Sequence, residues 1–162
     1  MQAQFLPQLL LGQNITLNSS LLTYTNVNNI PTPDPRSTED CLFLDVLVPQ
    51  SIWNTTQKAA VWVDIFAGGF ISGSKSTRTL NPVGLLQQSA NGTETPIIYV
   101  SMNYRLGMYG WLGGPTFQEN GTANAGLYDQ RLAIEWVKNN IANFGGDPNK
   151  ITLNGGSAGG SR

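Results

Sequence analysis

Three apolar runs along the chain have the length and composition of buried β-strands. They cover residues 41–48, which end at Pro49, residues 59–66, and residues 96–102, which are rich in Ile, Tyr and Val. Short runs with many β-branched and aromatic residues favour strands over helices. A fourth, shorter strand is predicted at residues 151–153, just before a glycine-rich segment.

Apolar residues between the third and fourth of these strands recur at helical spacing. They are Leu127, Leu132, Ala133, Trp136, Val137, Ile141 and Phe144. The spacing predicts a helix over about residues 125–143, with Gly145 and Gly146 just past its end as a stop signal. A shorter helix is predicted from Asn81 and Pro82 to about Ser89, because asparagine caps helices and proline suits their first position.

The alternation of strands and helices indicates one α/β domain. Apolar strands separated by helices favour a mostly parallel central sheet with flanking helices. Residues 1–36, in which Pro31, Pro33 and Pro35 lie close together, are predicted to form an irregular lead-in. Residues 37–162 are predicted to form the domain, since neither an internal repeat nor a change of composition marks another one.

Composition and charge limit the partners of this domain. The 162 residues are 40% hydrophobic, which suffices for a core, but only 12% charged, with a formal net charge of -1. Because nucleic acids and anionic membranes are bound by basic patches, we expect neither as a partner. No apolar run reaches the roughly 20 residues of a membrane-spanning helix, and no basic segment of a signal peptide is evident. We expect no cofactor and no metal ion, and the sequence gives no oligomeric state.

Five N-x-S/T sequons indicate a secreted glycoprotein. A chain of this composition would hold roughly two or three by chance, and each of the five falls in a polar, loop-like stretch where an acceptor can be reached. The only cysteine, Cys41, is either a small buried side chain or pairs with a partner outside this chain. The candidate glycosylation sites are Asn14, Asn18, Asn54, Asn91 and Asn120.

Ser157 is the side chain that the sequence most plainly offers as a nucleophile. It lies in Gly155-Gly156-Ser157-Ala158-Gly159, a G-x-S-x-G pattern directly after the fourth predicted strand. In a nucleophile elbow the strand turns sharply into a helix, and glycines flank the serine because a Cβ there would collide with neighbouring backbone. The alternative is an ordinary glycine-rich turn. A serine hydroxyl also needs a base, usually histidine, and the chain contains no histidine.

A second glycine-rich segment, Phe66-Ala67-Gly68-Gly69-Phe70, follows the second predicted strand. Acyl transfer passes through a tetrahedral oxyanion, which backbone N–H groups in a loop of small residues can approach closely. In α/β-hydrolases one such donor belongs to the residue after the nucleophile and another to a loop after an early strand. Gly68, Gly69 and Ala158 are therefore candidate oxyanion-hole donors, and a tight turn without a role is the alternative.

Four stretches of the chain match the usual sequence motifs of one known family. They are Glu39-Asp40-Cys41-Leu42-Phe43-Leu44-Asp45-Val46-Leu47-Val48-Pro49, Asn103-Tyr104-Arg105-Leu106-Gly107, Asn124-Ala125-Gly126-Leu127-Tyr128-Asp129-Gln130-Arg131, and Phe144-Gly145-Gly146-Asp147-Pro148 continuing to Gly159. Over about residues 37–162 the chain resembles the type B carboxylesterase/lipase family, the cholinesterase-like branch of the α/β-hydrolases. The resemblance implies the N-terminal part of an α/β-hydrolase fold, truncated just after the nucleophile elbow. It also implies a serine esterase or lipase that forms an acyl-enzyme on Ser157 with a small-molecule ester.

The resemblance assigns further residues and implies that others lie elsewhere. The triad histidine and its acid, usually glutamate, would lie downstream, so this fragment is expected to be inactive alone. Arg105 and Asp129 would form a buried structural ion pair, whose loss is expected to destabilise the fold by several kcal/mol. Glu39 would pair with an arginine near the N-terminus of the family, and Cys41 with an upstream cysteine, and this chain lacks both of these partners.

Three positions depart from the usual motifs of the family. Gly156 stands where the family most often has glutamate, Ala67 replaces the first of three glycines, and Phe66 replaces a histidine that is common in esterases. The loss of negative charge favours a neutral acyl ester over a cationic, choline-like substrate.

The alternative to an enzyme is a non-catalytic cholinesterase-like adhesion or binding protein, or a pseudogene remnant. The retained Ser157 favours the enzyme.

Overall fold

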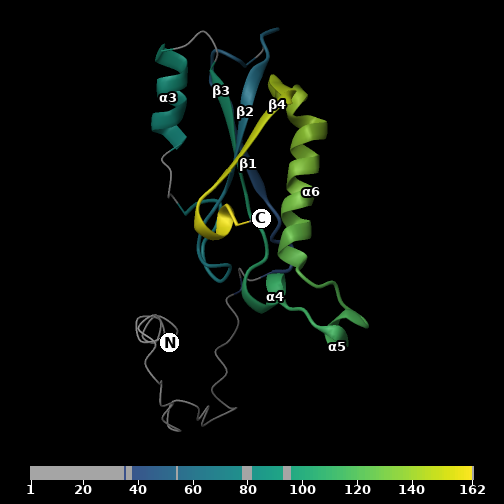
Figure 1. Ribbon diagram of the computed structural model, residues 1–162. Coiled ribbons are helices and arrows are strands. Elements are labelled where there is room, and N and C mark those ends of the chain that lie inside the picture. Colours follow the sequence, from purple (N-terminus) through teal and green to yellow (C-terminus); the bar gives the residue numbers. More distant parts are fainter. Residues whose placement is uncertain (1–34, 36–37, 54, 78–81, 93–95, 162) are drawn as a thin grey trace, which may run out of the picture. The chain divides into compact units, whose positions relative to one another are not determined.

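The computed structural model describes residues 35, 38–53, 55–77, 82–92 and 96–161 (Figure 1). The chain divides into two units, Met1–Thr38 and Glu39–Arg162. All helices and strands of the described residues belong to the second unit. Apart from Pro35, the predicted lead-in over residues 1–36 lies outside the described residues.

Four strands of the described residues form one mixed sheet in the order β1-β3-β2-β4. They are β1 (Leu44–Leu47), β2 (Ala59–Ile65), β3 (Ile97–Met102) and β4 (Gly146–Gly155). β2 pairs in parallel with both β3 and β4, whereas β1 runs antiparallel to β3. The predicted α/β fold with a mostly parallel sheet is confirmed.

The two outer strands differ in length from the prediction. β1 is shorter than residues 41–48, because only Leu44–Leu47 pairs with β3. β4 is much longer than residues 151–153, since Gly146 already pairs with Ala59 of β2 across a register irregularity. Residues 147–150 are Asp-Pro-Asn-Lys, so an apolar pattern could not show that their backbone is extended.

The long predicted helix is present as α6 (Ala125–Asn140), followed by the 3-10 helix η3 (Ile141–Phe144). The expected single helix over residues 125–143 therefore changes type at Ile141. Gly145 ends the segment with a φ of 83°, a left-handed conformation that favours glycine, so the predicted stop signal is confirmed.

The shorter predicted helix is α3 (Pro82–Gly92), which continues three residues beyond Ser89. α4 (Gly107–Trp111) and α5 (Pro115–Gln118) were not predicted, because helices of five and four residues are too short to show a helical period. Among the described residues, no helix combines the length and apolar character that crossing a membrane would require.

The sheet has two faces of different chemistry, because successive side chains of a strand point to opposite sides. Figure 1 shows α3 and α6 on opposite sides of the sheet. One face packs against Val137 of α6 and Ile141 of η3 and forms the core with them. The members of this face on β2 and β3 are Val61, Val63, Ile65, Ile98, Val100 and Met102. The opposite face carries Asp64, Tyr99 and Asn154.

Candidate active site

Ser157 lies in a strained turn at the end of β4. Its φ is 51°, in the left-handed region that residues other than glycine seldom adopt. Gly156 before it is extended, and the 3-10 helix η4 (Ser157–Gly159) begins at the serine itself. The Ser157 residue is exposed. A strand, a strained exposed serine and a helical turn are the parts of a nucleophile elbow.

Three glycines leave room for this turn, which we call the elbow (residues 155–160). A Cβ on Gly155 would lie 2.1 Å from the carbonyl oxygen of Gly159, and one on Gly159 would lie 2.1 Å from that of Ile65. At Gly160 the corresponding distance to the Gly155 oxygen is 2.5 Å. Gly156 is different, since a Cβ there would meet nothing within 4 Å. Close packing therefore requires glycine at three positions of the elbow but not beside the serine at 156.

The glycine loop (residues 66–70) starts at the same end of the sheet as the elbow, where the parallel strands β2 and β4 finish. β2 and β4 are parallel, and Ile65 at the end of β2 is the register partner of Gly155 at the end of β4. Gly159 also lies so close to the Ile65 carbonyl that no Cβ fits between them. The sheet thus brings the predicted nucleophile and the predicted loop donors to neighbouring strand ends.

Positive φ values mark the backbone at Gly68, Gly69 and Phe70 in the glycine loop. Gly68, Gly69 and Phe70 have φ values of 142°, 61° and 66°. The Gly68 carbonyl accepts hydrogen bonds from the N–H groups of Ile71 and Ser72, at 3.2 and 3.1 Å. Within the described part of the chain, the N–H groups of Gly68 and Gly69 donate to no backbone carbonyl. Such donors can serve a developing oxyanion.

Phe70 fixes the far end of the glycine loop. Its ring packs against Trp111 of α4 with the ring centroids 4.5 Å apart. Its carbonyl accepts a hydrogen bond of 2.8 Å from the N–H of Gly107. Phe70 therefore anchors the loop.

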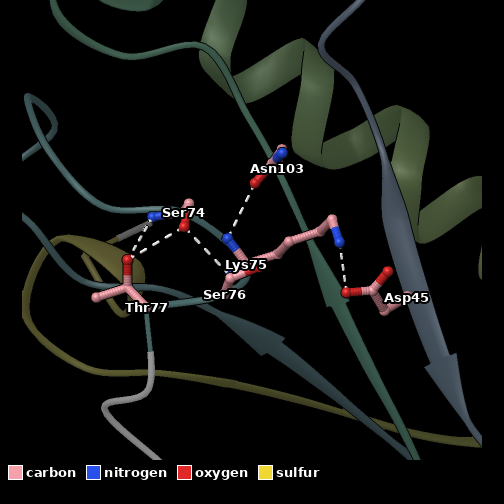
Figure 2. A network of polar contacts seen from close by, with 6 residues as sticks. All are labelled: Asp45, Ser74, Lys75, Ser76, Thr77 and Asn103. Atoms are coloured by element: carbon pink, nitrogen blue, oxygen red, sulfur yellow. Dashed lines mark hydrogen bonds and ion pairs between the residues drawn. The ribbon is translucent and has the colours of Figure 1, made fainter. Parts of the chain in front are cut away.

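Lys75 ties the segment after the glycine loop to two strands (Figure 2). Its backbone N–H donates to Oδ1 of Asn103 at 2.9 Å, just after β3. Its ammonium forms an ion pair with Asp45 of β1. Next to it, the N–H of Ser74 donates to Thr77 Oγ1 at 2.9 Å and closes a tight turn. The segment that leaves the glycine loop is thus held by side chains as well as by backbone.

A buried polar cluster that sequence reasoning missed lies between β3, β2 and β4. Asp64 accepts hydrogen bonds from the Tyr99 hydroxyl at 3.1 Å and from Nδ2 of Asn154 at 2.7 Å. Burial, and then the Asp64 carboxylate, raise the pKa of Tyr99, so its hydroxyl stays protonated and donates. The available signal was a carboxylate inside the otherwise apolar run of residues 59–66.

Arg105 and Asp129 form the predicted ion pair in a bidentate arrangement. Nε and Nη2 of Arg105 donate to the two carboxylate oxygens at 2.8 and 2.7 Å, and the Arg105 backbone N–H donates to Oδ2 at 2.9 Å. The hydrogen bond to Asp129 raises the pKa of Arg105. The expectation of a fully buried pair needs correction, since the exposed fraction is 3% for the Asp129 side chain but 42% for that of Arg105. A guanidinium can keep one edge in water while it binds a buried carboxylate.

Two of the predicted glycosylation sites fall on described, exposed residues. Asn120 lies in a turn, as expected. Asn91 lies in the last turn of α3 rather than in a loop, because this helix runs on to Gly92. Asn14, Asn18 and Asn54 lie outside the described residues, so a secreted glycoprotein stays a prediction.

Cys41 is a half-buried free thiol. In the part of the chain that the structure describes, no group of three His, Cys, Asp or Glu residues could hold a metal ion.

Comparisons with known proteins find one family model and several relatives that match most of the chain. A family model described as "Carboxylesterase family" matches residues 13–162. The chain is 49% identical over 136 residues to carboxylesterase patB of Penicillium expansum, covering 78% of this chain and 24% of the relative. It is 41% identical over 133 residues to the inactive carboxylesterase-like protein VdtD of Byssochlamys spectabilis, covering 82% of this chain and 21% of the relative. The crystal structure of Aspergillus niger EstA matches with a TM-score of 0.64 and 40% identity, covering 75% of this chain and 22% of that one.

The chain spans about a quarter of the length of these relatives. The family model covers the glycine loop, the ion pair and the elbow together, and the fold agrees with that of the solved EstA structure. The resemblance inferred from four motifs is confirmed, and the chain belongs to the carboxylesterase family.

Proposed function

We propose that this chain supplies the nucleophile and the oxyanion hole of a serine carboxylic ester hydrolase. The observation that carries the proposal is the φ of 51° at the exposed Ser157. A non-glycine residue persists in such a conformation only where its surroundings enforce it, and strain of this kind concentrates at functional sites. Here the enforcing contacts are those of the three close-packed glycines of the elbow.

The proposed reaction uses groups that the sheet brings to one edge. The Ser157 hydroxyl attacks the carbonyl carbon of an ester and loses its proton to a general base. The resulting oxyanion accepts hydrogen bonds from the N–H groups of Gly68, Gly69 and Ala158. The alcohol then leaves with a proton, and water releases the acyl group from Ser157. Loss of one oxyanion donor would raise the barrier by about 3 kcal/mol.

The general base of this reaction has to come from outside the 162 residues. The chain contains no histidine, and no hydrogen bond joins the Ser157 hydroxyl to another described side chain. We therefore propose that residues 1–162 alone do not turn over esters. A longer polypeptide would complete the triad with a histidine and an acid.

The uncharged residue beside the nucleophile favours a neutral ester over a cationic one. Gly156 is exposed and carries no charge, although a Cβ at this position would meet nothing within 4 Å. The absence of a carboxylate beside the nucleophile is therefore not forced by contacts at the Cβ position. Without one, the site lacks the negative charge that would attract a quaternary ammonium group, and we propose a neutral acyl ester as substrate.

A non-catalytic binding or adhesion protein, or a pseudogene remnant, is the second candidate. The 41% identity to a relative whose name calls it inactive favours this alternative, because a family member can keep the fold without turnover. Unlike the fold, the strained and exposed Ser157 is a feature of the site itself, and it favours the enzyme.

Ester turnover that depends on Ser157 separates the two candidates. The longest natural polypeptide that contains these residues would be assayed with p-nitrophenyl butyrate and with a choline ester. We expect hydrolysis of the neutral ester, a fall in kcat of about 10⁴-fold or more in Ser157→Ala, and wild-type kcat in Ser76→Ala, an exposed serine outside the elbow. Residues 1–162 alone should give no more turnover than their Ser157→Ala variant.

Two results would contradict the proposal. Turnover that survives Ser157→Ala would remove the serine from the mechanism. A folded longer polypeptide that hydrolyses no ester and is not labelled by a fluorophosphonate would support the binding protein instead.

A further inference from the structure

We propose that Asp64 is a positioning residue that fixes the elbow and the glycine loop relative to each other. The proposal rests on the function proposed above. Asp64 lies on β2 four residues before Gly68, and its partner Asn154 lies on β4 three residues before Ser157. A single side-chain hydrogen bond thus joins the strand that ends in the loop donors to the strand that ends in the nucleophile.

The hydrogen bond between Asp64 and Asn154 adds to the backbone hydrogen bonds between β2 and β4, close to the ends of both strands. Asp64 and Asn154 are register partners on adjacent parallel strands. The 2.7 Å bond from Asn154 Nδ2 to Asp64 Oδ1 therefore runs directly across the pair. The other carboxylate oxygen of Asp64, Oδ2, accepts a hydrogen bond of 3.1 Å from the Tyr99 hydroxyl on β3. Both carboxylate oxygens are used, and three neighbouring strands are tied together just below the site.

Burial makes these two bonds obligatory for Asp64. The residue is 8% exposed, and Tyr99 is 4% exposed. None of the ion pairs among the described residues involves Asp64. A buried carboxylate without such donors would be strongly unfavourable. Hydrogen bonds to an ionised acceptor are short and directional, so the position of Asn154 on β4 is closely defined.

Stability of the fold does not by itself require a carboxylate at position 64, because an apolar residue could fill the same place. Replacing buried charged groups by well-packed apolar ones is often neutral or stabilising, which argues that specificity of position is what Asp64 provides. Oxyanion donors have to lie within a narrow distance of the developing charge, and a misplacement of about 1 Å can lower the rate by roughly 10²-fold. A shift between β2 and β4 would move the donors of Gly68 and Gly69 relative to Ser157.

An electrostatic role of Asp64 would predict the opposite change in kcat when the carboxylate is removed. A carboxylate near an oxyanion disfavours the transition state, so its removal would raise kcat if charge were its main effect. If position is the main effect, removal lowers kcat. The sign of the change therefore separates the two roles.

The test exchanges the two side chains in the longest natural polypeptide. Asn154→Asp places two carboxylates face to face on β2 and β4, and we expect kcat to fall by about 10²-fold with KM nearly unchanged. The double exchange, Asp64→Asn with Asn154→Asp, restores one carboxylate and one amide and should return kcat to within about fivefold of wild type. Thr152→Val, on the same strand two residues earlier, is the matched control and should keep the wild-type kcat.

Further measurements keep this proposal distinct from the proposed function and from a purely structural role. Rates are compared per folded molecule, well below the Tm of each variant. Amide hydrogen exchange at Ala158 and Gly159 should be faster in Asn154→Asp and slow again in the double exchange, even if the wild type hydrolyses no ester. If Asn154→Asp does not fold, Asp64→Asn alone is decisive, with a kcat about tenfold lower expected.

The proposal is overturned by any of three results. In the first, Asn154→Asp lowers the Tm but leaves kcat per folded molecule unchanged. In the second, Asp64→Asn raises kcat or leaves it as in the wild type. In the third, the double exchange recovers the Tm while kcat and the exchange rates of the elbow stay changed.

Discussion

Gly156 and Gly159 flank the same serine but face different surroundings. A Cβ on Gly159 would lie 2.1 Å from the Ile65 carbonyl oxygen, whereas one on Gly156 would meet nothing within 4 Å. Gly156 also has an ordinary extended backbone, with a φ of -105°. The requirement for glycine at position 159 therefore comes from contact with the end of β2, not from proximity to the nucleophile.

This difference predicts unequal effects of two single-methyl substitutions. Gly159→Ala should lower the free energy of unfolding by at least about 2 kcal/mol, because backbone has to move to admit the methyl group. Gly156→Ala should leave it unchanged or raise it by about 0.5 kcal/mol, since alanine has fewer unfolded conformations to lose. Urea unfolding of the two variants measures both values. Equal losses would show that the backbone conformation, rather than the contact with Ile65, makes the elbow need glycine.

The sequence predicted the residues of the elbow and not those of the cluster below it. Ser157 and its glycines are contiguous, so a short pattern with a known steric reason identifies them. Asp64 and Asn154 are 90 positions apart. A polar side chain in an apolar strand signals that some buried partner exists, but only strand pairing decides which residue it is.

Arg105 and Asp129 join two elements that meet at one end of the sheet. Arg105 lies between β3 and α4, and Asp129 lies in the first half of α6. The carboxylate is buried, while the guanidinium is partly exposed. The two partners therefore differ in what each would lose if the other were removed.

The asymmetry predicts that loss of the arginine destabilises the fold more. Arg105→Met leaves a buried carboxylate with only one backbone donor, and we expect about 3 kcal/mol less stability. Asp129→Asn leaves a guanidinium that can turn to water, and we expect a loss of about 1 to 2 kcal/mol. Thermal and urea unfolding of the two variants give the comparison. A larger loss for Asp129→Asn would mean that its hydrogen bond to the Arg105 backbone, rather than the buried charge, dominates.

Elements with a clear apolar period were predicted well, and the others were not. α6 and the strands around Val63 and Val100 show their periods in the sequence. The first half of β4 does not, because its extended conformation comes from pairing with Ala59 rather than from its polar side chains. α4 is held by tertiary contacts such as that of Trp111 with Phe70. Such contacts leave no local pattern to find.

At the scale of the whole molecule, β4 is one of the two edge strands of the sheet in the described part of the chain. In the described residues it lies at the edge of the sheet and pairs only with β2. Leu153 of β4 is 51% exposed. Together with Ile134 and Ile151 it lines an open groove of about 430 Å³ between α6 and β4. An exposed edge with apolar side chains is a template for pairing with further chains.

The polypeptide of residues 1–162 should therefore self-associate. Unpaired N–H and C=O groups along β4 can pair with another copy, and the apolar groove beside them adds hydrophobic area to the contact. Leu153→Lys puts a charge on this edge and should shift the chain toward monomer in sedimentation velocity experiments. Met108→Lys, which changes an exposed apolar residue on α4, is the matched control and should not. A wild-type polypeptide that stays monomeric and unfolds cooperatively at the same concentration would show that the edge is covered, and the association would then have no structural basis in β4.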